Sequence, residues 1–202
     1  MKPYKQSSFL SPHECDIVNK YMDLRVLNRN VSRYKGKSGT HFQLGGDALS
    51  DGIGLVYRDT VANLLKKDVV LSYSMVRRYS KHSFLGWHRN RWEAEHAVII
   101  QISDDSWPMG FIEGQDNPLI EGEQKPSMIL SCHQGDAIIF NAAETYHGRH
   151  RLKLDSLTTL NLYYVEAGGY LDNKDRRINY GDNYKSQHNP DSHQWKITAE
   201  KQ

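Results

Sequence analysis

The sequence predicts a mainly β, α+β domain, an antiparallel sandwich or barrel with helices packed on one face. The chain has 202 residues, the length of one ordinary domain. Two segments with helical spacing of apolar residues precede residue 69, and beyond it the spacing changes from 3.6 residues to two. About seven short strand candidates then follow, separated by Gly, Pro, Asp and Asn clusters, a pattern typical of antiparallel sheets.

The first helix is predicted by its start signal. Ser11 is an N-cap residue, Pro12 suits the first turn, and Glu14 completes a capping box with Ser11. Apolar residues then recur at helical spacing, so we expect a helix over about 12–25.

The next segments change character twice. Residues 28–50 are rich in Gly and Ser and lack a period, which predicts a loop, and an apolar stripe over about 51–66 predicts a second helix. From residue 69, Leu71, Tyr73 and Met75 alternate with other residues, as in a half-buried strand. The remaining strand candidates are Phe84–His88, Ala97–Ser103, Ser127–Cys132, Ala137–Phe140, Tyr146–Arg151 and Leu157–Val165.

Composition excludes several classes of protein. The 26 basic and 24 acidic residues leave a net charge of +2, which suits neither a nucleic-acid coat nor a membrane-surface protein. No apolar run is long enough to span a bilayer, and the N-terminus lacks the apolar region of a signal peptide. Two cysteines, Cys15 and Cys132, favour a reducing, cytoplasmic setting. We expect one domain over 1–170 followed by a polar tail over 171–202, with the oligomeric state left open.

Histidine is the one residue type in excess, with ten in the chain. His88 ends one strand candidate and His147 begins another. A lone strand histidine is more often a hydrogen-bonded structural residue than a metal ligand, so the pair alone does not establish a site.

The sequences that flank both histidines resemble those of a known family. Residues 79–90 and 95–103 resemble the first half of the 2-oxoglutarate and Fe(II)-dependent oxygenases, and the style is nearest to the prolyl-hydroxylase-like branch. Residues 134–140, followed by 144–149, are similar to the later segment of that family, with its Gly-Asp, Phe and His. The resemblance covers about residues 69–166 and implies a double-stranded β-helix, a jelly-roll or cupin-like barrel with the N-terminal helices packed outside.

The resemblance implies a non-haem Fe(II) oxygenase that uses 2-oxoglutarate to hydroxylate a small-molecule or amino-acid-type substrate. His88 and His147 take the places of the two histidine ligands, and Asn90 stands where the family has its carboxylate ligand. Such iron sites use few protein ligands so that positions stay open for oxygen and cosubstrate. An amide oxygen is a neutral, weaker ligand. Glu93 or Glu95 is an alternative carboxylate, although acids in loops are usually solvated.

The cosubstrate position also departs from the family. Leu157 stands where the resemblance places an arginine for the far carboxylate of 2-oxoglutarate. Arg149 is the natural substitute, because it follows His147 by two residues and shares its face in an unbroken strand. Its guanidinium fits a carboxylate in bidentate fashion, although a surface arginine is an equally open interpretation. Tyr79 and Gln101 match positions where the family turns polar groups toward the cosubstrate.

These departures leave other functions open. One alternative is a chain with altered or lost catalysis that serves as a metal- or ligand-binding module. Another is a halogenase-like or 2-oxoglutarate-independent variant. Basic residues gather on both sides of the proposed site, which favours an anionic small-molecule ligand. They are Arg77, Arg78, Lys81, His82, Arg89, Arg91, Arg149, Arg151 and Lys153. Substrate identity lies in residues 28–50, 104–126 and the tail, which carry no readable pattern.

Overall fold

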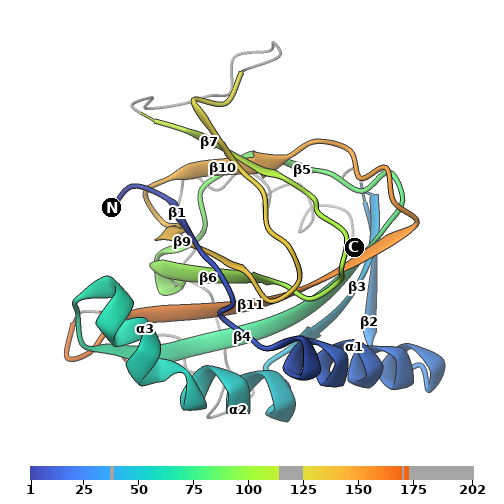
Figure 1. The fold of residues 1–202 in the computed structure, drawn as a ribbon, viewed down its shortest axis with the longest axis horizontal. Helices are drawn as coiled ribbons and strands as arrows, with labels where there is room; N and C mark the ends of the chain where they lie inside the picture. The colour runs from blue at the N-terminus through green and yellow to red at the C-terminus, as the bar shows by residue number, and fades with distance from the viewer. Residues whose placement is uncertain (37–38, 114–124, 170, 173–202) are drawn as a thin grey trace.

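A computed structural model describes residues 1–36, 39–113, 125–169 and 171–172. Within these residues, eleven strands form two antiparallel sheets, and three helices cover one face of the larger sheet (Figure 1). The helices are α1 (Pro12–Leu27), α2 (Ala48–Val56) and α3 (Arg58–Leu65), with a short 3-10 turn η1 (Trp92–Ala94). The strands are β1 (Tyr4–Gln6), β2 (Ser32–Gly36), β3 (Gly39–Gly45), β4 (Val69–Ser80), β5 (Leu85–His88), β6 (His96–Gln101), β7 (Met109–Ile112), β8 (Met128–Leu130), β9 (Ala137–Asn141), β10 (Tyr146–Arg149) and β11 (Ser156–Glu166).

The two sheets differ in size and in what covers them. The larger sheet has the order β1-β9-β6-β11-β4-β3-β2, and the smaller has the order β5-β10-β7-β8. One apolar cluster, which includes Val18, Val61 and Leu160, fills the space between the helices and the larger sheet. A second cluster, which includes Phe111 and Phe140, lies between the two sheets. A cavity opens between the sheets beside this second cluster.

Helix α1 confirms the predicted start signal. The Ser11 side chain accepts a hydrogen bond from the Glu14 amide, and the Glu14 carboxylate accepts one from the Ser11 amide at 2.8 Å. The helix continues to Leu27, two residues beyond the predicted end.

The predicted loop over 28–50 is wrong, because most of it is ordered by strand pairing. β2 and β3 form a hairpin, and β3 pairs with β4 from His41 opposite Tyr79 to Gly45 opposite Met75. The long strand β4 supplies the backbone hydrogen bonds, so this segment needs no apolar alternation of its own to become a strand. The hairpin extends the larger sheet at the edge nearest the cavity.

The predicted helix over 51–66 is two helices. α2 begins earlier, at Ala48, where the Asp47 side chain accepts a hydrogen bond from the Leu49 amide. The chain then breaks at Tyr57, whose dihedral angles leave the helical region, and α3 follows.

Strand β4 is buried on both faces, whereas the sequence pattern predicted a strand with only one buried face. Its outward-facing Ser74 hydroxyl contacts Ser50 of α2 at 2.7 Å, so the helix covers the side that alternation assigned to solvent. An irregularity pairs Tyr73 with Tyr163 but Leu71 with Tyr164, and Leu71 joins the helix-side cluster instead of sharing the face of Tyr73. The other face of the strand contributes to both the cavity and the apolar cluster between the sheets.

The sequence missed strands β1 and β7, and β7 lies within the segment 104–126 that showed no pattern. Residues 114–124 of that segment, and the predicted tail from residue 173 onward, lie outside the described residues. Among the described helices, none is long and apolar enough to cross a membrane.

Candidate active site

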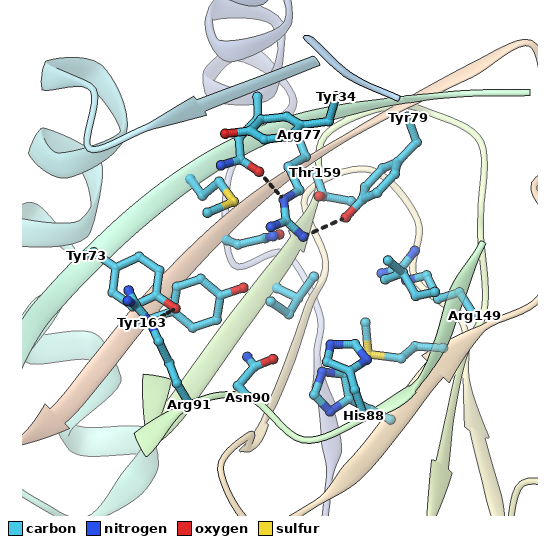
Figure 2. Close-up of a pocket in the computed structure, with 17 residues that line it drawn as sticks. Tyr34, Tyr73, Arg77, Tyr79, His88, Asn90, Arg91, Arg149, Thr159 and Tyr163 are labelled. Carbon is cyan, nitrogen blue, oxygen red and sulfur yellow. Dashed lines mark hydrogen bonds between the residues drawn. The ribbon is translucent and has the colours of Figure 1, made fainter. Parts of the chain in front are cut away.

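A cavity of about 210 Å³ lies between the two sheets (Figure 2). Its walls come from β3, β4 and β11 of the larger sheet and from β5 and β10 of the smaller sheet. Arg77, Arg91, Arg149 and two histidines line it, and none of its lining residues in the described part of the chain is acidic. The cavity is therefore strongly electropositive and suited to anions.

The two predicted histidines meet at the cavity wall. β5 and β10 pair so that His88 and His147 lie directly opposite, with ring centroids 4.3 Å apart. The Nδ1 atom of His88 lies 2.8 Å from the carbonyl oxygen of Gly86, and that of His147 lies 2.9 Å from the carbonyl oxygen of Thr145. Each carbonyl accepts a hydrogen bond from the Nδ1–H, which places the lone pair of each ring on Nε2. The His88 ring also forms a hydrogen bond with the Asn90 side chain.

The electrostatics favour neutral imidazoles. Burial lowers the pKa of His88, and burial together with His88 lowers the pKa of His147 well below its ordinary value. A metal ion binds imidazole in its neutral form, so neither histidine needs to lose a proton at neutral pH before binding.

Asn90 lies two residues after His88, at the edge of the same cavity (Figure 2). The backbone N–H of Asn90 donates to the backbone carbonyl of Ala142 at 2.8 Å, which fixes the main chain where it leaves β5. Within the described residues, no group of three or more His, Cys, Asp and Glu side chains is placed to hold a metal. The neutral side chains at this wall that could donate to a metal ion are the two imidazoles and the Asn90 amide.

The alternative carboxylates lie elsewhere. Glu93 and Glu95 line a separate pocket beside Trp92 and Glu144. Glu95 also contacts the His96 ring at 3.3 Å. Neither acid lines the cavity that contains the two histidines, so neither replaces the carboxylate that Asn90 lacks.

Arg149 lines the cavity together with His147, as two-residue alternation along β10 predicts, although the pairing of β10 with β5 is irregular between these two residues. The side chain is buried, its Nη1 donates to the carbonyl of Trp107 at 2.6 Å, and its guanidinium stands 4.9 Å from the Trp107 ring centroid. Burial lowers the pKa of Arg149. No ion pair within the described residues includes Arg149, so its charge meets dipoles and a ring but no carboxylate.

Of the other two residues predicted to contact the cosubstrate, one lines the cavity and one does not. Tyr79 lines the cavity and packs edge-on against Trp107. Leu157 packs with both in a small apolar cluster, so no cation stands at its position. Gln101 does not line the cavity, because its amide donates to the carbonyls of Ser103 and Asp105 in the turn after β6.

Sequence reasoning missed the inner faces of β4 and β11. Arg77 shares the face of Tyr79 on β4, and Thr159 and Asn161 stand on the inner face of β11. The signal was present as two-residue alternation from Tyr79 back to Arg77, but Arg77 appeared only as one of many local cations.

Comparisons with known proteins concern the fold. No family model matches the chain, and no curated protein matches it. Among solved structures, the epimerase SnoN from nogalamycin biosynthesis, described as non-haem and α-ketoglutarate-dependent, is 11% identical over 92% of this chain and 86% of that chain, with a TM-score of 0.68. HygX from Streptomyces hygroscopicus, solved with nickel, 2-oxoglutarate and hygromycin B, is 11% identical over 82% of this chain and 83% of that chain, with a TM-score of 0.61. A prolyl-4-hydroxylase from Pseudomonas putida is 12% identical over 82% of this chain and 93% of that chain, with a TM-score of 0.56.

These likenesses, with the two facing antiparallel sheets, confirm the predicted fold class, a mainly β double-stranded β-helix with helices packed outside. Several of the similar structures are described as 2-oxoglutarate-dependent or as members of the 2-oxoglutarate and Fe(II) oxygenase family. They include an epimerase and a carbocyclase as well as hydroxylases, so the fold alone fixes no single reaction.

Proposed function

We propose that this protein is a non-haem Fe(II) enzyme that uses 2-oxoglutarate to oxidise, most simply to hydroxylate, a small-molecule or amino-acid-type substrate. One observation carries the proposal. His88 and His147 lie opposite each other with both Nδ1 atoms bound to backbone carbonyls, and both face the cavity that contains Arg149. The arrangement supplies two ordered metal ligands and one cation for an acidic cosubstrate.

The donor set fits a divalent metal ion. Imidazole is a suitable ligand for iron and for its substitute nickel, and the fixed tautomers direct both Nε2 atoms away from the backbone. Asn90 would add a neutral oxygen or orient a water molecule. When bound, Fe(II) with 2-oxoglutarate supplies oxygen activation coupled to oxidative decarboxylation of the oxo acid.

The remaining residues would bind and orient the cosubstrate. Arg149 is held by Trp107 and would pair with the far carboxylate of 2-oxoglutarate. The Tyr79 hydroxyl would donate a second hydrogen bond to the same carboxylate. Because the site lacks a protein carboxylate, the negative charge of the cosubstrate replaces part of what an aspartate at position 90 would provide.

Metal binding tests the ligand assignment. We expect His147→Gln to abolish tight, stoichiometric Ni(II) binding, measured by titration calorimetry. The exposed His150, three residues away, supplies the matched control, and His150→Gln should bind as the wild-type protein does. Equal Ni(II) affinity in the wild-type protein and both variants would reject the site.

A second proposal follows from Asn90 and has a different outcome. An amide in place of the carboxylate also suits a barrel that binds metal or ligand without catalysis, or a halogenase-like or 2-oxoglutarate-independent variant. Iron binding without any conversion of 2-oxoglutarate to succinate favours the binding module. Chloride-dependent product formation favours the halogenase-like variant.

We further propose that residues 1–170 form one catalytic-type domain that works in the reducing cytoplasm. Cys15 and Cys132 are free and buried, as is common for intracellular thiols. Burial raises the pKa of each to about 11, so neither is a nucleophile at neutral pH.

A further inference from the structure

A second cation, Arg77, faces the cavity from the opposite sheet. It stands on β4 above the cavity, and Arg149 stands to the side on β10 (Figure 2). Its Nε donates to the Gln43 side chain at 2.9 Å, and its Nη1 lies 3.5 Å from the Tyr79 hydroxyl. Both partners are neutral, and no ion pair within the described residues includes Arg77.

The adjoining strand β11 carries two buried side-chain oxygens that have no hydrogen-bond donor within the described residues. Thr159 is the cross-strand neighbour of Arg77, and Asn161 follows two residues later on the same face. Within the described residues, Thr159 Oγ1 and Asn161 Oδ1 are buried and make no hydrogen bond. An unpaired buried polar atom costs about 1–3 kcal/mol, so both oxygens would gain a hydrogen bond from a bound water or ligand.

The hydrogen-bonding groups of these three residues indicate which chemical groups a ligand would need. A guanidinium and a hydroxyl side by side can both donate to one carboxylate. Asn161 Oδ1 is a hydrogen-bond acceptor. The Cα atoms of Thr159 and Asn161, two residues apart on β11, are about 7 Å apart. The Oδ1 atom would take a donor group, such as a hydroxyl or an N–H, on the same molecule.

Charge balance assigns this subsite to the substrate. This step rests on the proposed function, in which Arg149 and the metal ion take the two carboxylates of 2-oxoglutarate. The dianion then cancels the charge of the metal ion, and the lining residues offer no acid to balance Arg77 and Arg149. Arg149 is buried and Arg77 is half-buried, and a positive charge withdrawn from water without a counterion is unfavourable, so the second ligand should bring negative charge.

We propose that Arg77, Thr159 and Asn161 form a substrate subsite that selects a small acid carrying a hydrogen-bond donor near its carboxylate, as hydroxy acids and amino acids do. Arg77 binds the carboxylate and sets the specificity for acids. The hairpin of β2 and β3 positions it, because Gln43 of β3 holds its Nε.

The test uses matched probes that differ in one charge. N-acetyl amino acids and their primary amides share a skeleton and an N–H donor, and only the acids carry a carboxylate. Binding of each pair is measured by ligand-observed NMR, both to the metal-free protein and to the protein loaded with Ni(II) and 2-oxoglutarate. We expect wild-type protein to prefer the acids by about tenfold or more, the worth of a charge-assisted hydrogen bond.

Variants assign that preference to Arg77. Arg77→Gln should abolish it, Arg77→Lys should retain part of it, and the exposed neighbour Arg33→Gln should leave it unchanged. The affinity of each variant for 2-oxoglutarate with Ni(II) is measured in parallel. We expect that affinity in Arg77→Gln to stay within about twofold of the wild-type value.

The outcomes separate this inference from the proposed function. Wild-type protein that binds 2-oxoglutarate but shows no preference for acids overturns the subsite alone. A large loss of 2-oxoglutarate affinity in Arg77→Gln also overturns it, because Arg77 would then belong to the cosubstrate. A preference for acids that depends on Arg77, in a protein that binds no 2-oxoglutarate with Ni(II), supports the anion subsite and refutes the proposed function.

Discussion

Arg149 offers a prediction in which function and stability separate. Arg149→Met removes the cation assigned to the far carboxylate of 2-oxoglutarate. Removing one partner of a buried ion pair costs about 3–5 kcal/mol, which corresponds to a loss of roughly 10²- to 4 × 10³-fold in 2-oxoglutarate affinity. The assay is a titration of 2-oxoglutarate into the Ni(II)-loaded protein.

The same substitution should change the stability of the ligand-free protein little. It removes one hydrogen bond to the Trp107 carbonyl, about 1 kcal/mol, and the contact with the Trp107 ring, about 0.5–2 kcal/mol. It also removes an arginine that no acid among the described residues pairs with, which offsets part of the loss. We expect a net change in unfolding free energy within about 2 kcal/mol, measured by urea denaturation.

The control is Arg151→Met, because Arg151 is exposed and, within the described residues, its Nη1 donates to the His82 carbonyl at 3.3 Å. That variant should keep wild-type affinity for 2-oxoglutarate. Unchanged affinity in Arg149→Met, with the fold intact, would refute the assignment of Arg149 to the cosubstrate.

Three further predictions concern other sites. Burial, followed by Arg77, lowers the pKa of His41 to about 4, below its ordinary value of 6.5. Its contribution to stability is therefore complete above pH 6.5 and is lost as pH falls toward 4, by up to about 3 kcal/mol, and urea unfolding of His41→Gln should lack this pH dependence. Asn90→Asp should raise Fe(II) affinity about tenfold or more in anaerobic titrations, since a carboxylate is the stronger ligand, and no gain would contradict the metal site. Ser11→Ala should lower the unfolding free energy by about 1 kcal/mol through loss of the capping box, with no change in metal binding.

Local signals predicted the parts of the fold whose causes are local. The capping box located α1, and two-residue alternation located most strands, including the long β11. The hairpin of β2 and β3 was missed because its order comes from pairing with β4, which is remote in sequence. The second buried face of β4 was missed for the same reason, since α2 covers it only in the folded chain.

The candidate site divides along a similar line. His88 and His147 were proposed as ligands because their flanking residues resemble a known family, and strand pairing places the two residues opposite each other. Arg77 was missed because a polar residue on a strand gives no sign of facing a cavity until the opposite sheet is in place. Gln101 does not line the cavity, because its amide bonds to the turn that follows β6, a local interaction that strand alternation does not reveal.

The most direct measurement is an anaerobic titration of Fe(II) into the purified protein with and without 2-oxoglutarate, followed in the visible spectrum. Chelation of the oxo acid by iron held at His88 and His147 gives a weak metal-to-ligand charge-transfer band. We predict a band that requires protein, Fe(II) and 2-oxoglutarate together and that is absent in His147→Gln. Iron binding without the band would contradict the cosubstrate, and no iron binding at all would contradict the metal site itself.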